Sequence, residues 1–227
     1  RGRQGEAARN AADSVLTFLQ RAKETIALIG YFGPAELQAN PYQFFHALEN
    51  NPAILEVVYL DASGTLLASA HQDSAVLADL FTIPQSNWFR QAHAGSEYLG
   101  DIQLSLDNEP YVILAVPAHN GDVIAARLHM QVLGDVLAAL RFGETGQAYV
   151  VNLTGQVIAH TDPHVVATNT NLSTDTGLSQ LLLNTDKQWN GMYINFANRP
   201  VVGTTVPVPG TDWAVITELA QSEAYAV

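Results

Sequence analysis

The chain repeats one pattern of residues about ninety positions apart. Residues 60–69, which contain Gly64, return as residues 151–160, where Gly155 holds the same place at an offset of 91. Further along, Pro117 is matched by Pro207 at an offset of 90. Two separate matches at nearly one offset indicate a duplicated module, and a long period seen only twice predicts tandem globular subdomains rather than a solenoid.

The composition supports a folded, acidic protein. With 227 residues, 48% of them hydrophobic, the chain can build one large core or two small ones. Its 22 acidic and 10 basic residues give a net charge of −12, which repels phosphate backbones, so nucleic acid is not an expected partner. The absence of cysteine excludes disulfides and thiol chemistry. It fits an extracytoplasmic protein and a cytosolic one almost equally well.

No segment of the sequence is typical of a membrane span. The longest apolar runs have the length of buried strands, far short of the ~20 residues that cross a bilayer, and no signal peptide is visible. Residue 1 is arginine, so we expect an excised fragment of a longer protein. Any membrane anchor would then lie outside residues 1–227.

Residues 1–53 are predicted to form a long first helix and a shorter second one. Apolar residues recur every three or four positions in the first thirty: Val15, Phe18, Leu19, Ala22, Ile26 and Ile29. Asn40 as the cap and Pro41 at the first helical position begin the second helix. We expect Phe44, Phe45 and Leu48 on one side of it.

Residues 54–142 form the first predicted module and residues 143–227 the second. Strands are expected at 54–59, 65–70, 98–105, 111–116 and 123–130, with a short helix after Pro84 and another at 131–140. The second module repeats this plan, with a hairpin at 147–160, a short helix at 178–183, strands at 188–196, 199–207 and 213–218, and an exit helix. Antiparallel sheets are the simple result, which makes the fold class α+β.

A series of short motifs, in order along nearly the whole chain, resembles the double Cache family of bacterial extracytoplasmic ligand sensors. The motifs are residues 88–92 (WFRQA), 98–105 (YLGDIQLS), 109–117 (EPYVILAVP), 146–151 (GQAYVV), 155–160 (GQVIAH), 171–173 (NLS) and 212–216 (DWAVI). Each motif is weak alone, and the series is fairly specific.

The resemblance implies a fold, a location and a function. A long helix would continue from a transmembrane segment and support a membrane-distal and a membrane-proximal subdomain, each an antiparallel sheet of PAS-like shape. The receptor would be a histidine kinase, a diguanylate cyclase or a chemoreceptor. Small molecules would bind the distal subdomain, at about residues 54–130, between its sheet and the segment that carries the tryptophan. No cofactor and no enzymatic activity of this fragment are implied.

Trp88 and Phe89 are candidates for the wall of such a ligand site. Neighbouring residues on a helix point in different directions, so the two rings are not expected to share one narrow core stripe, and one of them would line a cavity. The alternative is that both are core aromatics beneath a loop.

Arg127 stands in an apolar strand and shares one face with Ala125 and His129. A guanidinium offers a planar fork of donors that suits a ligand carboxylate. The alternative is a solvent-facing arginine or a structural salt bridge. As a ligand anchor, Arg127 would be dispensable for folding, as would Trp88, so truncating either is expected to abolish ligand-induced stabilisation without unfolding the domain.

Polar residues of the neighbouring predicted strand alternate on one face and would supply further donors and acceptors, or else lie on the surface. The complete set of expected ligand-binding residues is Trp88, Phe89, Asp101, Gln103, Ser105, Tyr111, Arg127 and His129. The amino-acid-sensing subset of the family has an arginine two residues before the tryptophan, where this chain has Ser86. An organic acid is therefore favoured over a free amino acid.

Catalytic and metal-binding alternatives find little support. His160, Asp162 and His164 resemble a zinc-binding cluster, but Pro163 places them in a turn. The loop at Asp61 resembles that of an aspartic protease, although its repeat has no acid and a hairpin turn explains both copies. No metal site and no catalytic residue are expected.

The expected mechanism converts binding into displacement of the long first helix. We also expect that two copies of the chain can form a homodimer through that helix. The alternative function is a structural ectodomain without a small ligand, which would read a partner binding protein.

Overall fold

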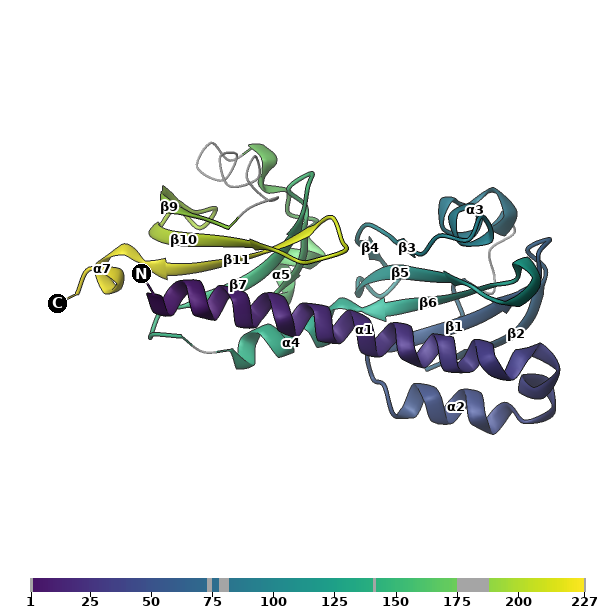
Figure 1. Ribbon diagram of the computed structural model, residues 1–227. Coiled ribbons are helices and arrows are strands. Elements are labelled where there is room, and N and C mark those ends of the chain that lie inside the picture. The colour runs from purple at the N-terminus through teal and green to yellow at the C-terminus, as the bar shows by residue number, and fades with distance from the viewer. Residues whose placement is uncertain (1, 73–74, 78–81, 141, 175–187, 227) are drawn as a thin grey trace. The chain divides into compact units, whose positions relative to one another are not determined.

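The computed structural model describes residues 2–72, 75–77, 82–140, 142–174 and 188–226 (Figure 1). The chain divides into two compact units. We call Leu19–Gln103 with Tyr111–His129 the β1–β6 unit, and Arg1–Phe18, Leu104–Pro110 and Met130–Val227 the β7–β11 unit. The predicted module bounds at 54–142 and 143–227 remain a prediction, and these compact units do not follow them.

The predicted long first helix is confirmed as α1 (Gly2–Ala39). Its regular geometry is interrupted at Gly33, where φ is 71° and ψ is 165°, immediately before Pro34. All six apolar residues of the predicted stripe are buried, so the stripe is the core-facing side of the helix. In the β1–β6 unit the helix runs close to the sheet, because a Cβ atom on Gly30 would lie 2.5 Å from the Ile124 Cδ1 atom.

The β1–β6 unit is built on an antiparallel sheet. Its strands are β1 (Ile54–Leu60), β2 (Leu66–His71), β3 (Tyr98–Leu99), β4 (Gln103–Leu104), β5 (Pro110–Pro117) and β6 (Val123–His129). Their order is β2-β1-β6-β5-β3, and β4 also pairs with β5. The prediction of one strand over 98–105 is wrong, because the chain leaves the regular ladder after Gly100, whose N–H bonds the Ile113 carbonyl oxygen, and rejoins β5 at Gln103.

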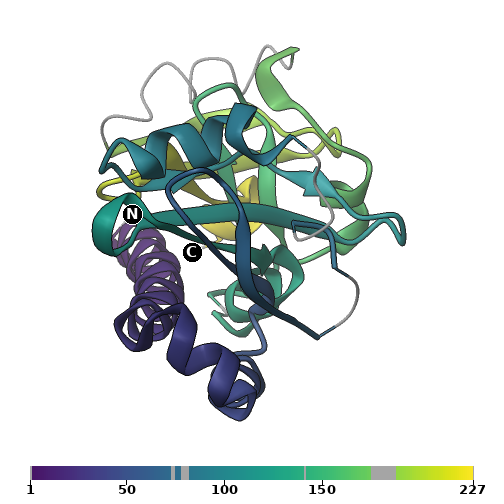
Figure 2. The same cartoon turned by 90° about the vertical axis from the view of Figure 1, so that its right-hand side faces the viewer.

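Helices cover both faces of this sheet. The single turn η1 (Ile83–Gln85) and helix α3 (Asn87–His93) lie over one face, while α1 and α2 (Pro41–Glu49) lie over the other (Figures 1 and 2). In α2, Phe44 and Leu48 are buried as expected, but Phe45 is 49% exposed. One position along a helix turns the side chain by about 100°, which takes Phe45 off the buried stripe.

The β7–β11 unit has a second antiparallel sheet. Its strands are β7 (Gln147–Asn152), β8 (Val157–His160), β9 (Trp189–Ile194), β10 (Pro200–Pro207) and β11 (Trp213–Ala220), in the order β8-β7-β11-β10-β9. The helical elements after β6 are α4 (Met130–Ala139), α5 (Pro163–Ala167), η3 (Leu172–Thr174) and α7 (Gln221–Ala224). The predicted helix at 178–183 lies outside the described residues.

Helix α4 belongs to the second sheet, although the sequence places it at the end of the first module. The reason is a close approach to β8, where a Cβ atom on Gly134 would lie 2.6 Å from the His160 carbonyl oxygen. The glycine lets the helix pack directly against the strand backbone. In the other sheet, strands β5 and β6 are connected by the short turn η2 (His119–Gly121).

The two sheets repeat the same turn and the same strand order, so they are copies of one module. Gly64 and Gly155 both have a φ of 83°. The Asp61 carboxylate accepts hydrogen bonds from the backbone N–H groups of residues 63 and 65, and the Asn152 side-chain oxygen accepts them from residues 154 and 156. Strands β1, β2, β5 and β6 thus correspond to β7, β8, β10 and β11.

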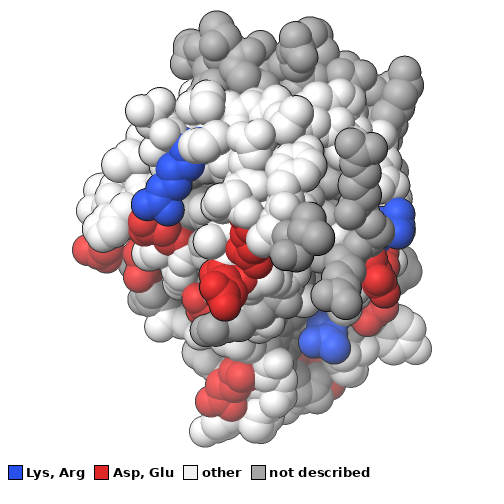
Figure 3. All heavy atoms as spheres, turned by 90° about the vertical axis from the view of Figure 1, so that its left-hand side faces the viewer, with Lys and Arg blue, Asp and Glu red and all other residues white. Residues whose placement is uncertain are grey.

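No helix in the described ranges is long and apolar enough to cross a membrane. On the face drawn in Figure 3, acidic and basic side chains lie scattered over a mostly uncharged surface.

Candidate ligand-binding site

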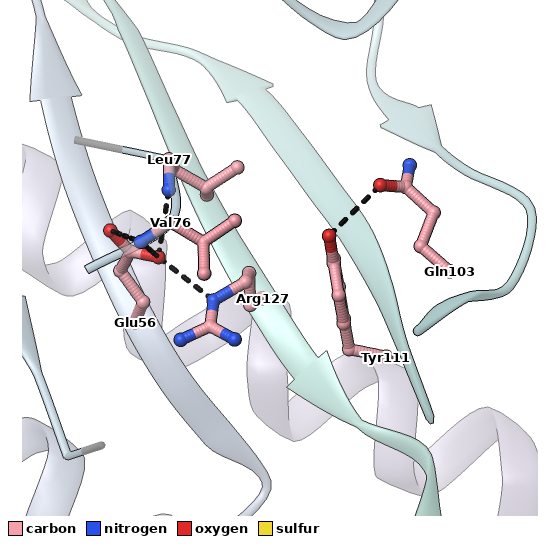
Figure 4. A network of polar contacts seen from close by, with 6 residues as sticks. All are labelled: Glu56, Val76, Leu77, Gln103, Tyr111 and Arg127. Carbon is pink, nitrogen blue, oxygen red and sulfur yellow. Dashed lines mark hydrogen bonds and ion pairs between the residues drawn. The ribbon is translucent and has the colours of Figure 1, made fainter. Parts of the chain in front are cut away.

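A buried ion pair lies at the centre of the β1–β6 sheet. Glu56 of β1 and Arg127 of β6 are opposite each other in the strand register, and the Arg127 Nε atom donates to the Glu56 Oε2 atom at 2.8 Å (Figure 4). Both side chains are fully buried. Burying two charges is costly unless they are paired and hydrogen-bonded, and here the two opposite charges are joined by this hydrogen bond.

The Glu56 carboxylate also binds the segment that follows β2. It accepts the backbone N–H of Val76 at 2.9 Å and that of Leu77 at 2.9 Å (Figure 4). A buried carboxylate needs several donors to replace its water shell, and backbone N–H groups supply them here. Glu56 therefore fixes both Arg127 and this segment over the sheet.

Tyr111 and Gln103 extend the polar network across β5 to β4. The Arg127 Cζ atom lies 5.3 Å from the centre of the Tyr111 ring, a cation–π distance. The Tyr111 hydroxyl donates to the Gln103 Oε1 atom at 3.0 Å (Figure 4). Burial raises the pKa of Tyr111, while the charge of Arg127 opposes that shift. Three predicted site residues, Arg127, Tyr111 and Gln103, are thus brought together.

The aromatic residues of α3 lie over the same face of the sheet. Trp88 and Phe89 are each 4% exposed and belong to one hydrophobic cluster with Tyr111, although the sequence analysis expected that they could not share a core stripe. Helix α3 is seven residues long and is covered by η1 as well as by the sheet, so it buries more than one narrow stripe. Their place as ligand contacts remains a prediction.

Ser86 has a local structural function at the start of α3. Its hydroxyl accepts the backbone N–H of Phe89 at 3.3 Å and donates to the Ile83 carbonyl oxygen at 2.7 Å. This is an N-cap, which satisfies one of the unpaired N–H groups of the first turn. The residue at the position of the amino-acid sensors' arginine thus holds the helix in place.

The remaining predicted site residues lie outside the network. Asp101 is exposed between β3 and β4. Burial raises the pKa of Tyr98, and the negative charge of Asp101 raises it further. The Ser105 hydroxyl accepts the backbone N–H of Glu109 at 3.1 Å and so holds a turn. His129 is half-buried at the end of β6, opposite Tyr111 in the register.

Sequence reasoning missed Glu56, the partner of Arg127. A usable signal exists, since Glu56 is the single charged residue in the apolar run of β1, as Arg127 is in β6. Two lone opposite charges in strands of one sheet are candidates for a buried pair.

His160, Asp162 and His164, which resemble a zinc-binding cluster in the sequence, form a turn and a helix cap in the structure. His160 is buried, and its Nδ1 atom accepts the backbone N–H of Asp162 at 2.8 Å. The Asp162 carboxylate caps α5 by accepting the N–H of His164, which is exposed. Within the described ranges, no group of three or more His, Cys, Asp or Glu side chains is arranged to hold a metal ion.

Comparison with known proteins places this chain in a family. The sequence matches the Cache domain family over residues 3–227. No protein with a curated description matches the sequence significantly. Solved structures match well in fold, among them the ligand-binding domain of the Pseudomonas aeruginosa amino acid chemoreceptor PctB in complex with L-Arg, with a TM-score of 0.71, 19% identity, and 98% of this chain and 95% of that one covered.

Two further structures share the fold. The extracellular domain assigned to the histidine kinase mmHK1S-Z2 has a TM-score of 0.74 and 14% identity, with 98% of this chain and 97% of that one covered. The ligand-binding domain of the Pseudomonas fluorescens chemoreceptor CtaA, in complex with L-alanine, has a TM-score of 0.71 and 15% identity, with 97% of each chain covered.

The chain therefore belongs to the Cache domain family and has its double form, with one long helix and two antiparallel sheets. Cache domains are extracytoplasmic sensory modules of membrane receptors, a ligand-binding rather than a catalytic class of domain.

Proposed function

We propose that this chain is the small-molecule sensing domain of a bacterial receptor, a histidine kinase, diguanylate cyclase or chemoreceptor, with the β1–β6 unit as its membrane-distal, ligand-binding part. The observation that supports this best is the network of Glu56, Arg127, Tyr111 and Gln103 on the α3-facing side of the first sheet. Family membership over residues 3–227 supports the sensory class.

The ligand we propose carries a carboxylate, and organic acids are favoured over free amino acids. A ligand carboxylate would join Glu56 at the guanidinium of Arg127, whose planar fork has five N–H donors. Ser86, which caps α3, lacks the charge that would hold an amino acid's carboxylate in the amino-acid-sensing subset. Because the similar domains of PctB and CtaA were solved with L-Arg, L-Gln and L-alanine, amino acids are the necessary comparison.

Signalling would proceed through α1. Its residues belong to both compact units, and within the β1–β6 unit it packs closely on Ile124 of β6, three residues before Arg127. A ligand that prefers one arrangement of this unit shifts the population of that arrangement, and α1 carries the change. We also propose that two copies pair through α1, which sedimentation of the purified chain would test.

One observation favours a second function, a structural ectodomain that reads a partner binding protein. Glu56 and Arg127 pair with each other while fully buried, and Trp88 and Phe89 are core residues. A structural salt bridge and a packed core would explain all four without a ligand.

A thermal-shift screen of the chain against organic acids and amino acids separates the two functions. A ligand that binds only the folded state stabilises it by about 2.7 kcal/mol at a hundred times its Kd. We expect a saturable shift with an organic acid that the double variant Glu56→Gln/Arg127→Met loses. The matched control is Lys23→Met, which removes a cation from a surface ion pair of the same unit and should keep the shift.

Absence of a shift with every carboxylate and amino acid would support the structural ectodomain, once mass spectrometry of the denatured protein has shown that no ligand was carried through purification. A shift with amino acids but not with organic acids would keep the sensor and overturn the ligand preference.

A further inference from the structure

The second sheet places a carboxylate where the first sheet has its guanidinium. Glu56 and Arg127 are register partners in the β1–β6 unit, and their counterparts at an offset of 91, Gln147 and Glu218, are register partners in the β7–β11 unit. Glu218 is 1% exposed. The duplicated module has therefore kept a buried charge at this position and reversed its sign.

Only neutral groups bind the Glu218 carboxylate in the described part of the chain. Its Oε1 atom accepts the hydroxyls of Tyr149 at 2.6 Å and Tyr193 at 2.7 Å, and its Oε2 atom accepts the Asn195 amide at 2.7 Å. The Asn195 side chain is fixed in this orientation because its oxygen accepts two backbone N–H groups. No Lys, Arg or His in the described ranges lies within ion-pair distance of Glu218.

Two further polar groups near Glu218 are buried without a hydrogen-bond partner among the described residues, the Nε2 atom of His160 and the hydroxyl of Thr205. Both residues lie in one register row across the sheet, Thr205 beside Ile216, Ile216 beside Tyr149, and Tyr149 beside His160. Their side chains share the face that carries Glu218, two positions further along β11. A buried polar atom that lacks a partner is costly, so its place needs an explanation.

The protonation of His160 follows from its hydrogen bond. Its Nδ1 atom accepts the N–H of Asp162, so in the neutral ring the proton is on Nε2. Burial lowers the pKa of His160 from 6.5, against the opposing effect of Asp162, which favours the neutral ring at neutral pH. His160 therefore presents an N–H donor that requires an acceptor.

Several aromatic rings lie on the face of the sheet that carries Glu218. The rings of Tyr149, His160 and Phe196 contact one another, with centroids 5.5 to 6.0 Å apart. The Tyr193 ring lies over Gly203, the register partner of Glu218, since a Cβ atom there would be 2.4 Å from the ring. A carboxylate among aromatic faces is the chemistry that recognises organic ammonium groups.

The same face of the first sheet is much less polar. The counterparts of Tyr149, Thr205 and His160 by register are Val58, Ala115 and Ser69. Val58 and Ala115 belong to the hydrophobic cluster under α3. The hydroxyl of Thr205 and the imidazole of His160 are thus additions of the second module, which the shared fold does not require.

We propose that the β7–β11 unit holds a second ligand site, centred on Glu218, for a small organic ammonium compound that also offers a hydrogen-bond acceptor to both His160 and Thr205. The ammonium group would pair with Glu218 among the aromatic rings. This site does not depend on ligand binding by the β1–β6 unit.

The test is a thermal-shift titration of the whole chain with ethanolamine, 3-amino-1-propanol and tyramine, each an ammonium compound with a hydroxyl acceptor, with ethanol and sodium chloride as controls. We expect a saturable rise in Tm with at least one of the three amines. Glu218→Gln keeps the shape and an acceptor oxygen but removes the charge, and should weaken binding about tenfold or more. The double variant Glu56→Gln/Arg127→Met, which changes the other unit, should bind the amine as the wild type does.

Thr205→Val gives a second, independent result. The change removes a buried hydroxyl that has no described partner, so the Tm of the protein without ligand should rise by about 2–4 °C. Binding of the amine should weaken in the same variant. A residue that lowers stability and strengthens binding is a binding residue.

Four results would overturn the proposal. They are no shift with any of the three amines, an unchanged response in Glu218→Gln, an equal Glu218-dependent shift with sodium chloride, and a Thr205→Val variant that is less stable but binds normally. The first would leave Glu218 as a structural carboxylate, and the third would indicate an inorganic cation.

Discussion

Glu56 and Arg127 form the only ion pair in the described part of the chain in which both side chains are fully buried. Such a pair responds unequally to single and double changes. Removing one partner leaves a buried charge uncompensated, whereas replacing both removes the charges together. The folding contribution of this pair can therefore be separated from its place in ligand binding.

Arg127→Ala should lower the free energy of unfolding by about 3–5 kcal/mol, because Glu56 stays buried without its cation. Glu56→Gln/Arg127→Met should stay much closer to the wild type, since glutamine still offers an oxygen to the N–H groups of Val76 and Leu77. Urea denaturation of the three proteins measures this. The expectation that Arg127 can be truncated without harm to the fold is replaced by this one.

Equal losses in the single and the double variant would contradict the paired arrangement. A loss below about 1 kcal/mol for Arg127→Ala would do so as well, because it is typical of an exposed ion pair.

The Asp61 turn should make the protein less stable in acid. Hydrogen bonds lower the pKa of Asp61 below 3.8, and the largest effect comes from the Ser63 hydroxyl, followed by the Thr65 N–H. The folded state then binds this proton less tightly than the unfolded chain, so the stabilisation is present above about pH 4 and lost as the pH falls through the folded-state pKa. Melting curves of wild type and Asp61→Asn should therefore differ at neutral pH and converge in acid.

Asn152 supplies the control for that measurement. It holds the equivalent turn with an amide that does not titrate. Asn152→Ala should cost about 1 kcal/mol at every pH. A difference between wild type and Asp61→Asn that persists in strong acid would show that the charge of Asp61 is not the cause.

The fold could be predicted well from the sequence because the chain contains two copies of one module. The Gly64 and Gly155 turns, the order of the strands and the long helix all follow from local periodicity and from the repeat. The misplaced details depend on tertiary contacts. Helix α4 packs on β8 because Gly134 permits a close approach, and local periodicity does not reveal the strand that a helix will contact.

The candidate site was less predictable for the same reason. Arg127, Tyr111 and Gln103 could be named from their alternation along strands, but the partner of Arg127 lies 71 residues earlier in β1. Pairing across that distance depends on strand order and register. Ser105 alternates correctly with Gln103, yet it takes part in a turn, because short polar side chains also bond the neighbouring backbone.

Gly64→Ala should destabilise the protein more than Gly210→Ala. Both glycines have a positive φ, 83° and 74°, which an alanine adopts at a cost of about 1–2 kcal/mol. At Gly64 the new Cβ atom would also lie 2.8 Å from the Pro84 Cγ atom, whereas nothing lies within 4 Å at Gly210. Chemical denaturation should show a further loss of about 1 kcal/mol or more at Gly64. Equal losses would mean that Pro84 moves aside freely.

His160 should add a second pH dependence, in a higher range than that of Asp61. Burial lowers its pKa from 6.5, so the unfolded chain takes up a proton before the folded protein does. Stability is then lost as the pH falls below about 6.5 and through the folded-state pKa. The variant His160→Gln, whose side chain does not titrate, should lack this part of the decline when melting temperatures are measured between about pH 8 and pH 5. Superimposable pH profiles of the two proteins would show that His160 is protonated as readily in the fold as in water, and would remove the argument that it presents a neutral N–H donor on the face that carries Glu218.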